Sequence, residues 1–243
     1  MNRFAAYSVI ALAYLVGGGS LILFGAFLCG KPFIVIGFDF SETQVLLWDG
    51  MLSMLFFIQH SGMIRPSFHV PRWFAMPLHY RSAIYAIASG VVLTAVVLLW
   101  QTSPTVLFEI RGTLQLLLST IFVLAIIGMM WCVWALSPFD LFGQSPIVHS
   151  LRGIKRQTPQ FVVRGPYFWV RHPLYFFTLV LVWTSPGETT DRWLFNVLWS
   201  CWIVVGAYLE ERDLVAEFGE RYRRYQKAVP MLLPWRGPVG RGM

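Results

Sequence analysis

Apolar and polar residues alternate along this chain in long blocks. Runs of about 20 apolar residues, the length that crosses the hydrocarbon core of a bilayer, lie at about residues 4–29, 45–64, 82–100 and 113–136. Two more follow a long polar connection, at about 174–183 and 193–209. The pattern predicts an all-α, polytopic membrane protein with about six transmembrane helices.

The fifth apolar run is short for a full crossing. It either extends back into the polar segment before it or forms a tight hairpin with the sixth run. The first run exceeds the 7–15 residues of a signal-peptide core, so we expect a retained helix. Gly17, Gly18 and Gly19 within it favour close helix packing.

Composition agrees with a membrane location. Hydrophobic residues make up 56% of the 243 residues and charged residues 13%, about half the charged fraction of a soluble domain. We expect one integral membrane domain over 1–243, with a four-helix scaffold at 1–136 and a cofactor-binding core at 137–243. Cys29, Cys132 and Cys201 stand singly in apolar surroundings, which predicts buried free thiols and neither a disulfide framework nor a metal site.

The net charge of +7 reflects topology. With six crossings, one side of the membrane carries 16 of the 19 Lys and Arg residues, and the other carries Lys31, Arg111 and Arg192. This is the positive-inside pattern, which predicts both termini in the cytoplasm. Nucleic acid is not needed to explain the charge, and a bacterial inner (cytoplasmic) membrane is the expected location.

A polar, aromatic segment follows the sixth run. On a helix, Phe218, Tyr222, Tyr225 and Val229 share one face, which predicts a C-terminal amphipathic helix. Its arginines are also typical of contacts with lipid headgroups. Glu210, Glu211 and Asp213 cluster just before it, where an apolar span ends. Ionisable groups at such a boundary are functional candidates, although solvation of a helix end also explains them.

The segment before the fifth run combines Arg171, His172 and Pro173. Pro173 suits the first turn of a helix, and backbone N–H groups at such a terminus attract carboxylates or phosphates. Tyr167, Phe168, Trp169 and Tyr175 surround the motif, and taken alone they are also typical of an aromatic belt at headgroup level.

Together, RHPLY and the later EERDLVAEFGERYRRYQKAVP resemble the C-terminal signature of the isoprenylcysteine carboxyl methyltransferase superfamily. QHSGMIRPSF, PFDLFG and VPMLLP extend the resemblance to its bacterial methanethiol S-methyltransferase branch and to NnrU-type proteins. The resemblance implies an integral membrane enzyme that methylates a small thiol with S-adenosylmethionine. By motif position it implies these cofactor residues: Arg171, His172, Pro173, Tyr175, Glu210, Glu211, Tyr222 and Tyr225.

A thiol reacts as its thiolate, so cationic groups should assist it. The family-like motifs make His60 and Arg65 candidates, with Asp140 of PFDLFG as an orienting acid or base. Each also has a structural interpretation: a bonded interhelical histidine, a snorkelling arginine and a turn residue. Ser137 and Pro138 stand where the branch commonly has Asn-His, which leaves the acceptor open.

Two other functions stay open from the sequence. Membrane sterol reductases resemble the same C-terminal pattern and bind NADPH, whose 2′-phosphate the basic cluster at 221–227 could hold. A non-catalytic NnrU-like membrane protein is the other. We find no charged residue in the middle of a span, which argues against a transporter.

Overall fold

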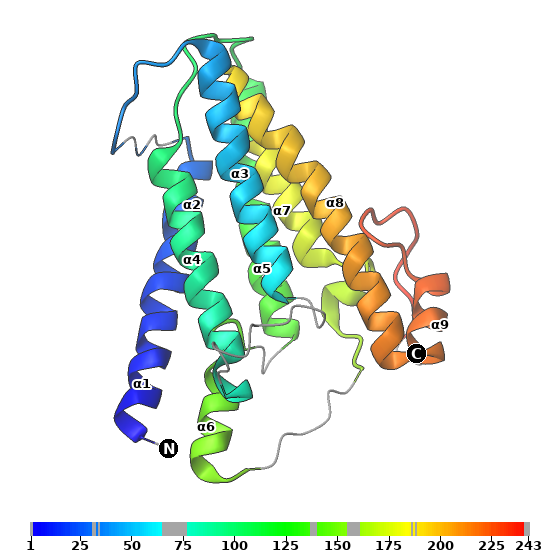
Figure 1. The fold of residues 1–243 in the computed structure, drawn as a ribbon. Coiled ribbons are helices and arrows are strands. Elements are labelled where there is room, and N and C mark those ends of the chain that lie inside the picture. The colour runs from blue at the N-terminus through cyan, green and yellow to red at the C-terminus, as the bar shows by residue number, and fades with distance from the viewer. Residues whose placement is uncertain are drawn as a thin grey trace. The chain divides into compact units, whose positions relative to one another are not determined.

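The computed structural model describes residues 2–30, 33, 35–64, 77–136, 140–154, 161–185, 187 and 189–240. Within them the regular structure is helical (Figure 1), apart from one isolated antiparallel bridge between Val106 and Thr189. The all-α prediction is therefore confirmed.

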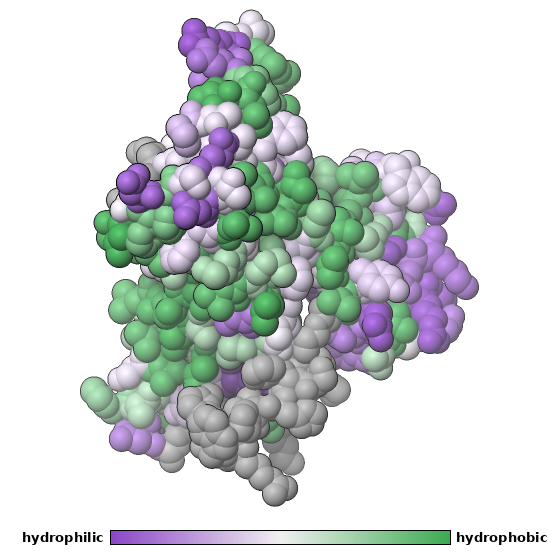
Figure 2. Space-filling model, turned by 45° about the horizontal axis from the view of Figure 1, so that its top comes forward, coloured by the Kyte–Doolittle hydropathy of each residue, from purple (hydrophilic) through white to green (hydrophobic). Residues whose placement is uncertain are grey.

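Four helical stretches are long and apolar enough to cross a membrane. They are Arg3–Leu28, Leu78–Leu99, Thr113–Ala135 and Thr190–Phe218. Large hydrophobic side chains on their surfaces are exposed, for example Trp134 at 76%, and Figure 2 shows broad areas of hydrophobic surface. In water such surface would be unfavourable, so the chain is a multi-pass membrane protein.

Helices α3 (Glu42–Ile64) and α7 (Pro173–Thr184) complete the six apolar runs. Helix α3 matches α5 in length but carries Asp49, Gln59 and His60, and α7 has 12 residues, fewer than a crossing needs. The count of six crossings stays a prediction.

Contacts divide the chain into two compact units. The first comprises residues 1–107, 140–158 and 189–195, and the second comprises 108–139, 159–188 and 196–243. Helix α5, which we expected in the N-terminal scaffold, belongs to the second unit with the RHPLY segment. Helix α8 (Thr190–Phe218) begins in the first unit and continues in the second.

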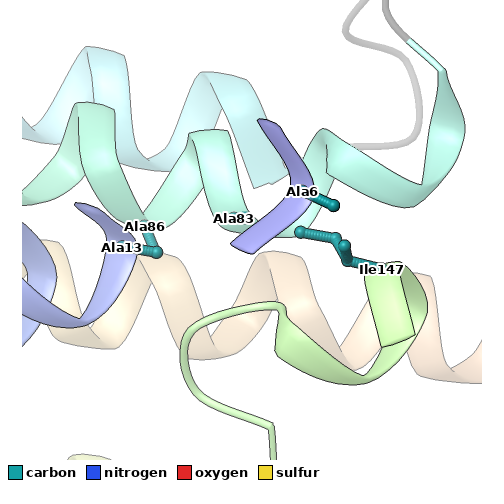
Figure 3. Close-up of a cluster of buried hydrophobic side chains, with 5 residues drawn as sticks. All are labelled: Ala6, Ala13, Ala83, Ala86 and Ile147. Atoms are coloured by element: carbon teal, nitrogen blue, oxygen red, sulfur yellow. The ribbon is translucent and has the colours of Figure 1, made fainter. Parts of the chain in front are cut away.

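The first unit is built on small residues. It holds α1 (Arg3–Leu12), the π-helical turn η1 (Ala13–Gly18), α2 (Gly19–Leu28), α3, the turn η3 (Leu78–Tyr80), α4 (Arg81–Leu99) and α6 (Gln144–Arg152). Four alanines and Ile147 form a buried cluster between α1, η1, α4 and α6 (Figure 3). A Cβ added to Gly90 would lie 2.8 Å from the Val16 carbonyl oxygen. Small side chains thus let these helices approach closely.

The glycine run of the first span behaves only partly as predicted. A Cβ added to Gly17 would lie 3.1 Å from the ring of Phe142, whereas one added to Gly19 meets no described atom within 4 Å. Phe142 is part of the PFDLFG motif, and its ring also packs on Tyr14 with centroids 4.6 Å apart. Phe142 therefore fixes its end of the PFDLFG motif to the turn η1 of the first span.

The first unit also buries acidic side chains. The Asp191 carboxylate accepts hydrogen bonds from Trp100 Nε1 at 2.9 Å and Ser103 N at 3.0 Å. Asp49, fully buried in α3, accepts one from Gln101 N at 3.0 Å. These two side chains satisfy the backbone N–H groups of Gln101 and Ser103 in the turn after α4, which need acceptors because they are buried. The apolar pattern of the spans did not predict this.

The second unit packs α5 (Thr113–Ala135) against α7, and α9 (Glu220–Ala228) against the end of α8 (Figure 1). A Cβ added to Gly128 of α5 would lie 2.3 Å from the Phe177 ring. Gly219, at φ +58°, separates α8 from α9. Tyr222, Tyr225 and Val229 are buried against other parts of this unit, including Phe161, so the predicted amphipathic face packs on protein.

The cysteine prediction was partly wrong. Cys132 is buried, but Cys29 and Cys201 are exposed. In a membrane protein an apolar setting does not imply burial within the chain, because apolar helix surfaces face lipid.

Candidate active site

The RHPLY segment is held by the C-terminal segment through the backbone. The turn η4 (Gly165–Phe168) leads to Arg171 and His172, and Pro173 begins α7. Arg171 N donates to Pro230 O at 2.9 Å, and His172 N donates to Met231 O at 3.1 Å. These two N–H groups, which lie just before the helix, are therefore already satisfied.

Glu211 is the centre of the polar cluster. Its Oε1 accepts hydrogen bonds from Arg171 Nε at 2.8 Å, His172 Nε2 at 2.7 Å and the Tyr222 hydroxyl at 2.7 Å. Its Oε2 accepts from Arg171 Nη2 at 2.9 Å and from Gln226 Nε2. A carboxylate has about four lone-pair sites, so the five donors saturate it, and its side chain is only 7% exposed.

The Arg171 guanidinium also makes several hydrogen bonds. Besides its two bonds to Glu211, its Nη1 donates to the carbonyls of Gln226, at 2.9 Å, and Val229. The buried ion pair thus has the additional hydrogen bonds without which desolvation would outweigh its attraction. Arg171 and Glu211 form an internal brace that joins three segments: the RHPLY turn, α8 and α9.

Glu210, one residue before Glu211, faces outward. Its side chain is 44% exposed, and Oε2 accepts a hydrogen bond from the Tyr175 hydroxyl at 2.7 Å. His172 Nδ1 lies 3.7 Å from the same oxygen, and the His172 and Tyr175 rings stack at 5.4 Å and 9°. An accessible carboxylate with one fixed donor can still accept hydrogen bonds from an ammonium group or sugar hydroxyls.

The buried tyrosines of α9 are donors. Burial, and next the hydrogen bond to Glu211, raise the pKa of Tyr222 above its ordinary value. Burial likewise raises the pKa of Tyr225, whose hydroxyl donates to the carbonyl oxygen of Tyr167 at 2.6 Å. Both hydroxyls keep their protons and tie α9 to the brace and to η4.

An apolar pocket of about 250 Å³ adjoins the RHPLY turn. Its walls are four aromatic rings (Trp131 of α5, Trp169, and Phe176 and Phe177 of α7), three prolines and Val170. One of the prolines is Pro173, so the pocket and the polar cluster use adjacent residues at the start of α7.

The predicted cofactor residues therefore come together in the second unit, whereas His60 and Asp140 belong to the first. His60, in the first unit, has ring nitrogens near the Tyr85 hydroxyl, at 3.1 and 3.0 Å, and Nδ1 3.3 Å from Ser89 Oγ. These contacts join α3 to α4. The catalytic role of His60 stays a prediction.

Asp140, also in the first unit, caps α6. Its carboxylate oxygens accept hydrogen bonds from the backbone N–H groups of Gln144, at 2.9 Å, and Ser145, at 2.7 Å, as capping side chains do. Arg65 lies outside the described residues. Among the residues that are described, no three His, Cys, Asp or Glu side chains gather where they could hold a metal ion.

Gln226 belongs to the same cluster but was not among the residues predicted from the sequence. It donates to Glu211 and its carbonyl accepts from Arg171. Its position four residues after Tyr222 places both on one helix face, and that spacing was the available signal.

Comparisons with known proteins give a consistent result. Over 197 residues the chain is 37% identical to the methanethiol S-methyltransferase of Pseudomonas deceptionensis, covering 80% of this chain and 74% of that protein. It is 30% identical over 243 residues to methanethiol S-methyltransferase 1 of Bradyrhizobium diazoefficiens, with 98% and 85% covered. Nurim of Mus musculus is 27% identical over 204 residues, with 77% and 72% covered. No family model and no solved structure matches.

Proposed function

The chain belongs to the methanethiol S-methyltransferase family, and we propose that it methylates a small thiol such as methanethiol, with S-adenosylmethionine as donor. The product would be a thioether, dimethyl sulfide for methanethiol. The observation that carries this proposal is the accessible Glu210 carboxylate beside His172 and Tyr175, next to the Arg171–Glu211 brace.

The residues present fit this donor. S-adenosylmethionine supplies a methyl group on a sulfonium, together with an ammonium group and ribose hydroxyls. Glu210 would accept hydrogen bonds from the ammonium or the hydroxyls, and the Tyr175 ring offers a π-face to a cation. Methyl transfer needs alignment and exclusion of water more than covalent chemistry. Glu211 would act through Arg171, His172 and Tyr222 by keeping the RHPLY turn and α9 in register.

His172 is our candidate for the group that takes the thiol proton. Glu211 accepts at Nε2, which orients the ring and leaves Nδ1 as the proton acceptor in the neutral form. With the proton at Nδ1, the cation would lie between two carboxylates, since Glu210 is 3.7 Å away. His60 and Arg65 stay as second candidates, and Asp140 as the least favoured because both its oxygens cap α6.

We further propose that the site opens to the cytoplasm of a bacterium and that both chain termini lie on that side. The distribution of Lys and Arg supports this orientation.

The first experiment compares S-adenosylhomocysteine and NADPH in calorimetric titrations of the detergent-purified chain. Micromolar binding of the former alone, followed by formation of dimethyl sulfide from methanethiol in headspace gas chromatography, is the expected result. Binding of NADPH alone would assign the chain to reductase chemistry, and binding of neither would favour a non-catalytic membrane protein.

A further inference from the structure

The apolar pocket beside the RHPLY turn is larger than methanethiol requires. Its volume of about 250 Å³ exceeds the roughly 150 Å³ of an apolar protein cavity that binds benzene. Pockets for drug-sized ligands begin near 300 Å³. Its size therefore suits a short alkyl chain or a single ring.

The chemistry of the walls selects an uncharged hydrocarbon group. Every lining residue is aromatic, proline or valine, and a buried polar group would find no partner among such side chains. Trp131 and Trp169 are 42% and 44% exposed, so two walls of the pocket reach the protein surface. A whole lipid chain, which extends over about half of a 30 Å hydrocarbon core, would protrude far beyond this space.

The position of the pocket connects it to the proposed reaction. Val170 and Pro173 line it, and the two residues between them in the chain are Arg171 and His172. A hydrocarbon group against Val170 and Pro173 would thus contact the residues on either side of the Arg171–His172 pair, and Pro173 directly follows the histidine that we assign to the thiol proton.

We propose that this pocket binds the alkyl or aryl group of the methyl acceptor, and that the acceptors it fits best are thiols larger than methanethiol. This inference rests on the proposed thiol methylation and deepens it by naming the acceptor class. Each methylene buried in the pocket should raise kcat/KM by about fourfold until the pocket is full, because burying one contributes about 0.8 kcal/mol.

The test measures kcat/KM at saturating S-adenosylmethionine for methanethiol, ethanethiol, 1-propanethiol and 1-butanethiol, with thioether products quantified by headspace gas chromatography. Longer thiols also partition into detergent, so each value is divided by that of Trp131→Leu, in which a smaller side chain replaces one aromatic wall of the pocket. Trp134→Leu is the matched control, because Trp134 lies on the same helix, is 76% exposed and does not line the pocket.

The ratio of wild type to Trp131→Leu should rise with chain length, while the ratio of wild type to Trp134→Leu stays flat. A flat first ratio, with methanethiol still methylated, would overturn the inference and leave the proposed function intact; a pocket filled by lipid would give this result. Absence of turnover with every thiol would refute the proposed function, and the inference with it.

Discussion

The adjacent glutamates of α8 should fail in different ways when each is changed to glutamine. Glu211→Gln leaves Arg171 buried without its counter-charge, a change that typically costs about 3–5 kcal/mol. For a chain of this length each kcal/mol corresponds to about 2–4 °C in Tm, so we expect Tm to fall by about 10 °C. Glu210 is 44% exposed, and an exposed interaction contributes at most about 1 kcal/mol, so Glu210→Gln should shift Tm by at most about 4 °C.

The affinity for S-adenosylhomocysteine should show the opposite order, with Glu210→Gln as the more damaging change. Loss of a charge-assisted hydrogen bond costs about 1.5–3 kcal/mol, so Glu210→Gln should weaken S-adenosylhomocysteine binding by about 10- to 150-fold. The assays are thermal unfolding in detergent and calorimetric titration at a temperature where both variants are folded. Equal losses of Tm in the two variants, or normal donor affinity in Glu210→Gln, would refute the assignment of Glu210 to the ligand and Glu211 to the brace.

Three further predictions test packing, proton transfer and topology. Gly128→Ala should lower Tm by about 2–10 °C because the new methyl overlaps the Phe177 ring, whereas Gly206→Ala, which meets no described atom within 4 Å, should leave Tm unchanged or raise it. His172→Ala should lower kcat by about 100-fold at neutral pH, and the deficit should shrink as pH approaches the thiol pKa, since the thiol then ionises unaided. A deficit independent of pH would indicate a structural role, and a larger loss in His60→Ala would transfer the assignment to that residue. Alkaline phosphatase fused to either terminus should be inactive and green fluorescent protein bright; the reverse would overturn the orientation derived from charge.

The sequence pattern predicted the helices of this site and, apart from Gln226, the residues around Glu211, but not which donors each carboxylate oxygen accepts from. Helical periodicity placed Tyr222 and Tyr225 on one face because that face follows from local geometry, and the structure adds that the face is buried. Which carboxylate is saturated depends on how α8, α9 and the RHPLY turn approach one another, which adjacent residues such as Glu210 and Glu211 do not reveal. The role of Asp140 was ambiguous for a related reason. From the sequence alone, an acidic residue in a turn before a helix is compatible with both helix capping and catalysis.

Burial was the least predictable property. Asp49 lies in an apolar run and is fully buried, although we saw no charged residue in the middle of a span. Its partner is the backbone N–H of Gln101, 52 residues away, and a one-dimensional hydropathy pattern carries no information on such a contact.

The order of synthesis adds a consequence of the brace. The carbonyl of Val229, which accepts a hydrogen bond from Arg171, lies 58 residues later in the chain. At a synthesis rate of 5–20 residues per second, it is made about 3–12 seconds after Arg171. During this interval the guanidinium gains the Glu211 carboxylate after 40 residues, and until α9 follows, water or lipid phosphates must take the place of the carbonyls of Gln226 and Val229. A chain terminated within the last turn of α8 would therefore contain every predicted span and Glu211, but would lack the two carbonyl acceptors that complete the brace.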